Sequence, residues 1–273
     1  MRFHFKIIFI FAFLVVFGYS ISLSLHNRTF VKILADAIDN LSHPEFYESL
    51  ANPAIKYVKI TEGMRKEEIA LMLSARFYWN ASSTEEFKGY DEYRDKKFEG
   101  KYFPDVYLVS RYITGVDMKE VMNERFEKKI STIESSVATS TVNMDRVLTI
   151  ASIIQREAAG KSDMKLISGI IKNRLSKGMS LQMDATLQYA KGNEENGWWP
   201  PVDPRDKKIN SPYNTYQNKG LPPSPIANPG LAAISAALNP QKTSCLFYFH
   251  KDSKIYCSAT YAEHKHKIDL YLK

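Results

Sequence analysis

Residues 7–25, which read IIFIFAFLVVFGYSISLSL, form an uncharged and mainly apolar run of nineteen residues. At about 1.5 Å per residue, a helix of this length just spans a hydrocarbon core of about 30 Å. Arg2, His4 and Lys6 precede the run, and basic flanks stay cytoplasmic. A cleaved signal peptide is the alternative, but its apolar region would be shorter and would end in a small-x-small site. We therefore expect a single-pass anchor in the cell inner membrane, with a cytoplasmic N-terminus and a periplasmic body.

The composition describes an ordinary globular body behind this anchor. The 273 residues include 37 Lys+Arg, 30 Asp+Glu and 44% hydrophobic residues, which excludes a disordered chain, a collagen and a polytopic channel. Subtracting Arg2 and Lys6 lowers the net charge from +7 to +5. On the outer face of a membrane a basic body can meet anionic lipid or wall polymer, while chromosomal DNA is out of reach. We expect no nucleic-acid partner; a charge that serves only solubility remains the alternative.

The pattern of the chain predicts an α+β fold built from several parts. KYVKI after Ile55 alternates like a strand, a helical pattern follows from Met64, and 98–109 reads as a turn and a short strand. Eight of the twelve prolines lie between residues 192 and 229, which predicts a long ordered loop system. The expected segments are a transmembrane anchor (1–25), a stalk (26–54), a small αβ module (55–110), a helical connector (111–143) and a mixed α+β domain with Pro-rich loops (144–273).

Two cysteines near the C-terminus flank a predicted hairpin. Cys245 and Cys257 enclose two aromatic or β-branched runs around a polar turn at 251–254. Folding the hairpin there places the two cysteines roughly opposite each other, and a disulfide is permitted outside the cytoplasm. Two reduced, half-buried thiols are the alternative. Because the sequence has no CxxC and no Cys/His ligand set, we expect no structural metal.

Residues 144–159 form the clearest amphipathic helix in the sequence. Its apolar face contains Glu157 where the spacing asks for an apolar residue. An acid on such a face loses hydration, which raises the pKa of its carboxyl and suits it to general-acid chemistry. The structural alternative is that Arg156 or Arg174 neutralises Glu157 in an ion pair.

Two further segments carry polar groups that suit a sugar or peptide ligand. Gln182, Asp184 and Thr186 alternate, so on an extended stretch they would share one face. Asp184 capping a following helix is the alternative. The run 211–216, SPYNTY, mixes flat aromatic faces with amide and hydroxyl groups, although an aromatic loop packed on its own core explains it almost as well. There is no Ser-His-Asp signature, Gly-rich phosphate loop or HExxH motif.

Several ordered motifs resemble one family. LTIASIIQREAAG (148–160), ISGIIKNRLSKGMSLQMDATLQYA (167–190), SPYNTY (211–216), GLPPSPIANPG (220–230) and EHKHKIDLYL (263–272) are similar to the MltG (YceG-like) endolytic murein transglycosylases. The resemblance covers residues 144–273 strongly. Upstream, VKITEGM and EGKYFPDVY resemble the LysM-like module of that family more weakly.

The resemblance implies a membrane-anchored lytic transglycosylase without a cofactor. Such an enzyme would cut nascent peptidoglycan between N-acetylmuramic acid and N-acetylglucosamine, leave 1,6-anhydromuramic ends and limit strand length. Its partners would be glycan strands, the cytoplasmic membrane and peptidoglycan synthases. Two alternatives stay open: a hydrolytic muramidase that uses Asp184 as second carboxylate, and a non-catalytic wall-binding scaffold.

The resemblance also assigns site residues. The catalytic glutamate of the family falls on Glu157, while many members carry another acid where this chain has Gln155. That departure favours Glu157 as the sole catalytic acid of its helix. The predicted substrate-binding residues are Asn173, Gln182, Asp184, Thr186, Tyr213, Asn214, Thr215 and Tyr216.

Overall fold

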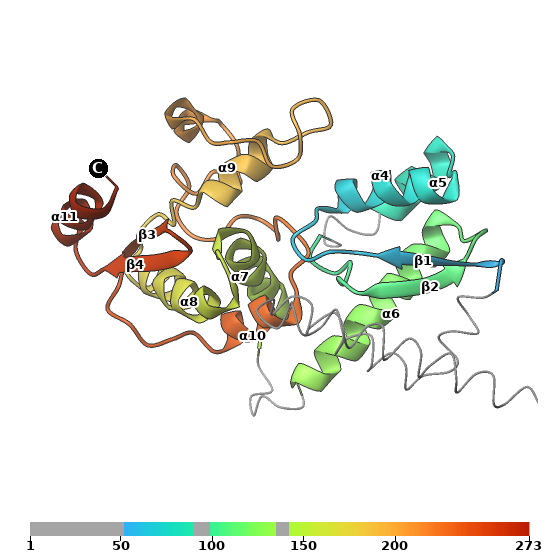
Figure 1. Cartoon of the computed structure of the whole chain (residues 1–273), viewed down its shortest axis with the longest axis horizontal. Coiled ribbons are helices and arrows are strands. Elements are labelled where there is room, and N and C mark those ends of the chain that lie inside the picture. Colours follow the sequence, from blue (N-terminus) through green and yellow to red (C-terminus); the bar gives the residue numbers. More distant parts are fainter. Residues whose placement is uncertain (1–51, 90–98, 135–141, 273) are drawn as a thin grey trace, which may run out of the picture. The chain divides into compact units, whose positions relative to one another are not determined.

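The computed structural model describes residues 52–89, 99–134 and 142–272 (Figure 1). The predicted anchor, 1–25, and all but the last three residues of the predicted stalk lie outside the described residues, as does 135–141 of the connector. Among the helices of the described ranges, none combines the length and the apolar character needed to cross a membrane.

The first part of the described chain is a small strand-helix-helix-strand unit. Its elements are β1 (Ile55–Lys59), α4 (Lys66–Phe77), α5 (Ala81–Lys88) and β2 (Val106–Ser110). Ile60 N, just after β1, donates to Asp105 O, just before β2, so the paired strands run antiparallel. The predicted strands and the first helix are confirmed. The sequence did not predict α5, which begins where the Asn80 side chain accepts a hydrogen bond from Ser83 N at 2.8 Å.

The long helix α6 (Gly115–Glu134) contributes to two hydrophobic cores. Met118 and Met122, in its first half, are fully buried with side chains from β1, β2, α4 and α5. Phe126 and Ile130, further along, pack into the core of the following helices. The helix that the sequence marks as a connector therefore ties the small unit to the rest of the described chain.

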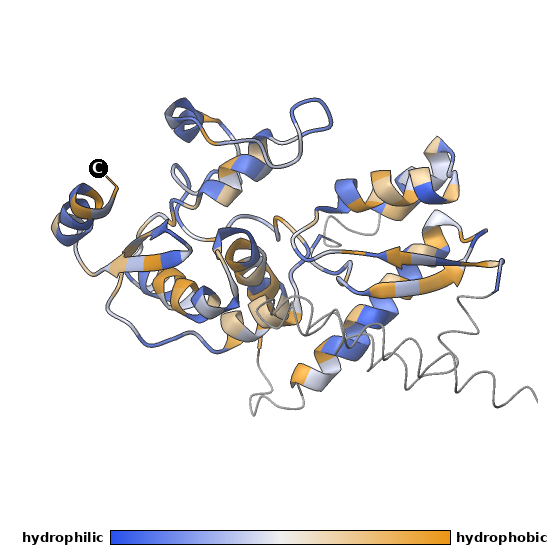
Figure 2. Cartoon of the chain, in the orientation of Figure 1, coloured by the Kyte–Doolittle hydropathy of each residue, from blue (hydrophilic) through white to orange (hydrophobic). Residues whose placement is uncertain are grey.

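Helices α7 (Met144–Glu157), α8 (Lys161–Ser176) and α10 (Leu231–Leu238) pack against one another. The apolar stripe of α7 is buried in their shared core, as its period predicts. In Figure 2, α10 is mainly hydrophobic and α7 and α8 alternate between both colours, whereas the segment that follows α9 (Asp184–Lys191) is largely hydrophilic. Gly178, at φ +62°, lies just beyond the end of α8, where a glycine readily takes a left-handed conformation.

The prediction that Gln182, Asp184 and Thr186 share one face of an extended stretch is wrong. Gln182 lies at φ +53°, so the chain turns there, and α9 (Asp184–Lys191) begins two residues later. Asp184 is in the first helical turn, where the helix dipole favours an acid. On a helix, residues two apart point in different directions, so Asp184 is exposed while Thr186 is buried.

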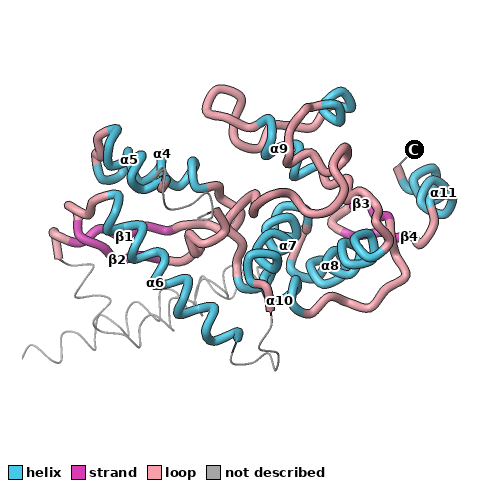
Figure 3. Tube along the Cα trace, turned by 180° about the vertical axis from the view of Figure 1, so that it is seen from behind, coloured by secondary structure: helices cyan, strands magenta, loops and turns pink. Residues whose placement is uncertain are grey.

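The Pro-rich segment is an ordered loop system, as predicted, interrupted by the short helix η1 (Pro204–Lys208). After α10 the chain runs as a loop alongside α8 to the hairpin, a path that Figure 3 shows from behind. Gln241 N donates to Lys165 O there at 2.9 Å. Gly169 is needed on α8 because any larger side chain would meet the Gln241 backbone.

The predicted hairpin consists of β3 (Phe247–Lys251) and β4 (Lys254–Ser258), followed by α11 (Tyr261–Tyr271). Asp252 and Ser253 both have positive φ, which matches a two-residue turn. Cys245 precedes β3 and is joined by a disulfide to Cys257 in β4, with Cα atoms 5.7 Å apart. The sequence allowed either a disulfide or two reduced thiols, and the structure shows the disulfide.

Candidate active site

Glu157 is the last residue of α7, and two donors from other elements hold its carboxylate. Ala185 N, in the first turn of α9, donates to Oε1 at 3.0 Å. The Tyr248 hydroxyl, from β3, donates to Oε2 at 2.7 Å. Each carboxylate oxygen therefore has one fixed partner, and the carboxyl is oriented by two elements that follow it in the chain by 28 and 91 residues.

Loss of hydration raises the pKa of Glu157 above its usual range. The hydrogen bonds from Ala185 N and Tyr248 act in the opposite direction because they stabilise the carboxylate. The charge of Asp184 raises the pKa again, and His250 lowers it. A carboxyl kept protonated to higher pH by burial is suited to donating a proton near neutrality.

The ion-pair alternative for Glu157 has no support in the described part of the chain. The Arg156 guanidinium stacks over the Trp199 ring, 3.8 Å from its centroid. Arg174 donates to backbone carbonyls, including Leu181 O at 2.6 Å and Leu246 O at 2.6 Å. No salt bridge of Glu157 with either arginine is present among the described residues.

A cavity of about 470 Å³ opens onto Glu157. Its walls come from α8, the turn before α9, η1, the 211–216 loop, the hairpin and α11, so it is built at a meeting point of many elements. The lining combines acids, bases and aromatic rings: Glu157, Arg174, Leu181, Gln182, Asp184, Lys207, Tyr216, Phe247, Tyr248, Tyr261 and His264. Flat rings beside charged and amide groups are the usual surroundings of a bound sugar or peptide.

Three of the predicted substrate-binding residues lie on this cavity. Gln182 and Asp184 are exposed on its rim, and Tyr216 lies beside them. The Tyr216 hydroxyl donates to Asp184 Oδ1 at 2.6 Å, which links the 211–216 loop to the start of α9.

The other five predicted residues do not line the cavity. The Asn173 amide donates to Thr243 O and Cys245 O and fastens the chain before the hairpin. Thr186 and Thr215 are buried and bond to each other at 2.9 Å, which connects α9 to the 211–216 loop. Asn214 is fully buried and donates to Ile209 O, and the Tyr213 hydroxyl bonds to Ser224 Oγ. In this structure these side chains support the walls of the cavity.

Sequence reasoning missed the residues that the hairpin and α11 bring to the cavity. Tyr248 contacts Glu157 directly, and Phe247, Tyr261 and His264 line the same cavity. The only signal in the sequence for these residues was the aromatic run before the hairpin turn. Nothing in that run indicates which aromatic ring contacts α7. His250 lies nearby and bonds to Asp163 Oδ2 at 3.2 Å.

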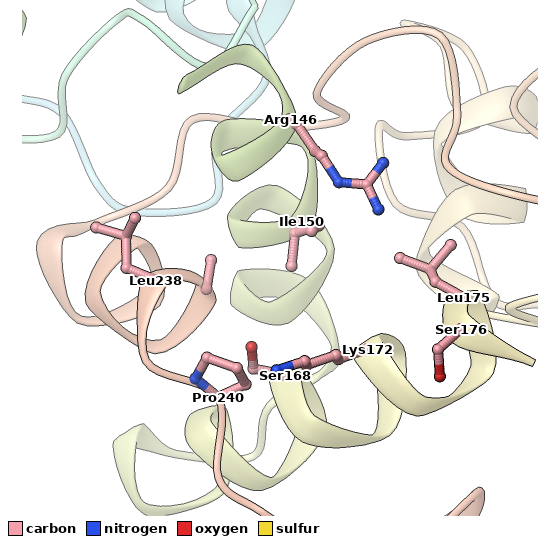
Figure 4. Close-up of a pocket in the computed structure, with 9 residues that line it drawn as sticks. Arg146, Ile150, Ser168, Lys172, Leu175, Ser176, Leu238 and Pro240 are labelled. Carbon is pink, nitrogen blue, oxygen red and sulfur yellow. The ribbon is translucent and has the colours of Figure 1, made fainter. Parts of the chain in front are cut away.

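A second cavity of about 470 Å³ lies between α7, α8 and the end of α10 (Figure 4). Figure 4 shows Arg146 and Ile150 on α7 facing Ser168 and Lys172 on α8. The lining contains no carboxylate, imidazole or thiol, so it offers no group for acid-base work near neutral pH. Within the described residues, no three His, Cys, Asp or Glu side chains gather as a metal site.

The chain is similar to proteins of known name. It is 36% identical over 176 residues to the endolytic murein transglycosylase of Bacillus subtilis (strain 168), covering 64% of this chain and 48% of that protein. It is 31% identical over 175 residues to the protein of the same name from Streptococcus pneumoniae (strain D39), covering 63% of this chain and 32% of that protein. The chain thus spans about half and about a third of these relatives.

A solved structure supports the same grouping. The crystal structure of a YceG-like protein from Listeria monocytogenes aligns with a TM-score of 0.69 and 28% identity, over 79% of this chain and 76% of that one. The model of the YceG-like family matches residues 19–269. Since that match takes in most of the sequence, the chain belongs to the YceG-like family.

Proposed function

We propose that this chain is an endolytic peptidoglycan lytic transglycosylase that cuts between N-acetylmuramic acid and N-acetylglucosamine. The observation that carries the proposal is Glu157: a single carboxyl of raised pKa, held by two donors at the edge of a cavity lined with aromatic and polar groups. The names of the relatives from Bacillus subtilis and Streptococcus pneumoniae support the same reaction class.

One carboxyl suffices for this reaction because the substrate supplies the nucleophile. Protonated Glu157 donates its proton to the glycosidic oxygen, and the bond from that oxygen to the muramic C1 breaks. The 6-hydroxyl oxygen of the same muramic residue bonds to C1, and its proton passes to the Glu157 carboxylate. No water is consumed, and the acid is regenerated. An internal hydroxyl replaces the second carboxylate that ordinary glycosidases need.

A hydrolytic muramidase is the second candidate, because Asp184 lines the same cavity as Glu157. The Tyr216 hydroxyl donates to Asp184 and so occupies one of its oxygens, which disfavours Asp184 as the activating base. Cleavage in water enriched in a heavy oxygen isotope separates the two reactions. The lytic reaction leaves the muramic end unlabelled, whereas hydrolysis introduces one labelled oxygen at C1.

We further propose that residues 7–25 anchor the chain in the cytoplasmic membrane, with the catalytic part on the outer face. The uncharged run and its basic flank support this orientation, and the Cys245–Cys257 disulfide suits an oxidising compartment. Protease should degrade the catalytic part in cells whose layers outside the inner membrane have been opened by osmotic shock, while the inner membrane itself is still intact. Protection until that membrane is lysed would contradict the orientation. Peptidoglycan synthases are the partners expected at this location.

A further inference from the structure

The cavity beside Glu157 contains more basic side chains than the cleavage chemistry uses. Arg174 is buried, at 6% exposure, and its guanidinium donates to three backbone carbonyls and to Gln182 Oε1. No carboxylate within ion-pairing distance of Arg174 is found among the described residues. A buried guanidinium without an acidic partner leaves a net positive charge that attracts an anion into the cavity.

Lys207 is a second cation on the same cavity, at its rim. It lies near the end of η1, with its ammonium 5.0 Å from the centroid of the Tyr216 ring. The backbone carbonyl of Lys207 accepts hydrogen bonds from the side chains of Asn214 and Gln217, so the turn that carries it is fixed. Its ammonium has no carboxylate partner among the described residues.

A short series of contacts connects Lys207 to the catalytic carboxyl. Its ammonium stands over Tyr216, the Tyr216 hydroxyl bonds to Asp184, and the residue after Asp184 donates its N–H to Glu157. Because Lys207 and Glu157 line the same cavity, a glycan strand bound at Glu157 can present a substituent to Lys207. Lys208 is exposed on the same turn but does not line the cavity.

We propose that Lys207, assisted by the charge of Arg174, binds a carboxylate on the O3 substituent of the muramic residue at the cleavage point. The inference rests on the proposed function. The glycan is otherwise uncharged, and its O3 substituent bears the lactyl carboxylate in bare strands or the peptide carboxylates in peptide-bearing strands. A lysine on a flexible stem suits an anion whose position varies between these two forms.

The test compares Lys207→Ala with the matched control Lys208→Ala, using the full chain. KM and kcat for release of anhydromuramic ends are measured on peptide-bearing strands, on strands stripped of peptides by an amidase, and on both after chemical amidation of their carboxylates. On the unmodified strands we expect Lys207→Ala to raise KM about five-fold with kcat little changed. On amidated strands that increase should shrink to the level of Lys208→Ala.

The pattern across substrates identifies the carboxylate. An increase confined to bare strands assigns the lactyl carboxylate, and one confined to peptide-bearing strands assigns the peptide. Equal effects of the two lysine variants on every substrate would overturn the inference. So would an increase for Lys207→Ala that survives amidation. Failure of the proposed function is a separate result, because the wild-type chain would then release no anhydromuramic ends from any substrate.

Discussion

At the scale of single residues, the Glu157 carboxyl is held between opposing influences. Burial and the Asp184 charge favour its protonated form, while the Ala185 N–H and the Tyr248 hydroxyl favour the carboxylate. A residue that serves first as acid and then as base needs access to both forms. The two donors also fix its direction, so the proton is delivered from one position.

Removing the Tyr248 hydroxyl should change the pH dependence of the reaction. Tyr248→Phe deletes a bond that stabilises the carboxylate, so the pKa of Glu157 rises further and the acid form persists to higher pH. The alkaline limb of the kcat/KM profile should therefore move to higher pH. Asp184→Asn removes a negative charge and should move the same limb to lower pH.

Tyr256→Phe is the matched control for this pair. Tyr256 lies on β4, packs at a tilt against Tyr271 with ring centroids 4.6 Å apart, and does not line the cavity. Removing the Tyr256 hydroxyl should leave the alkaline limb of the kcat/KM profile at the same pH. Shifts of Tyr248→Phe and Asp184→Asn in the same direction would contradict this electrostatic account of Glu157.

At the scale of elements, the hairpin and its disulfide position Tyr248. Cys245 lies two residues before β3 begins and is bonded to Cys257. Within β3, Tyr248 is paired with Cys257 across the two strands. Arg174 and Asn173, on α8, donate to the carbonyls of Leu246 and Cys245 and so fasten the start of β3 to that helix. The hairpin is thus fixed at its base, beside the cavity that Glu157 lines.

Reduction of the disulfide should lower both stability and activity. Closing a loop of this length contributes about 3 kcal/mol to the free energy of unfolding in the chain-entropy model, and less if the native state relaxes. Peptide mapping without reductant should recover Cys245 and Cys257 in one linked fragment. Reductant should lower the Tm of the wild type but leave the double variant Cys245→Ser/Cys257→Ser unaffected. An identical wild-type Tm with and without reductant would contradict the stabilising role.

Elements with a strong local pattern could be predicted from the sequence. The apolar period of α7 is such a local signal, and the helix that it predicts is confirmed. The extended row through Gln182 and Thr186 failed because an alternating polar pattern over five residues fits a turn followed by a helix equally well. The positive φ of Gln182 depends on the Gln182 N–H bonding to Thr215 O, a contact between distant segments.

At the scale of the whole molecule, the small unit and the bundle of α7, α8 and α10 meet around the end of α7. Gln155 Nε2 donates to Glu62 Oε2 at 3.4 Å, and Gln155 Oε1 accepts from Gly230 N at 3.1 Å. Asn228 adds a buried link, because its side chain accepts from Gly100 N and Tyr102 N and donates to Glu99. Gln155, two positions before Glu157, therefore joins the small unit to α7.

Introducing an acid at position 155 should weaken this junction. Gln155→Glu sets two carboxylates side by side and replaces a donor by an acceptor, at a cost of about 0.5–1 kcal/mol because both groups are partly hydrated. Tm should fall by a few degrees. Adding Glu62→Gln should restore it, since a donor again faces an acceptor. Additive losses in the double variant would show that the two side chains do not interact.

Contacts between distant segments also limit how much of the candidate site could be predicted from the sequence. Glu157 could be found because its helix has a clear apolar period that it interrupts. Asn173 and Thr186 belong to recognisable motifs, but the Asn173 amide donates to carbonyls 70 and 72 residues further along the chain, and Thr186 bonds to Thr215. No local pattern reveals such contacts. Tyr248 reaches Glu157 only after the hairpin docks on α8, so its contact depends on the tertiary fold.

The central claim is that Glu157 alone supplies the acid and base for a lytic cleavage. Mass spectrometry of the products from uncross-linked glycan strands, using wild type and Glu157→Gln, tests it most directly. We predict anhydromuramic ends from the wild type and none from Glu157→Gln, with the variant unfolding at a Tm no lower than that of the wild type. Anhydromuramic ends from the variant, or wild-type products heavier by one water, would contradict the account.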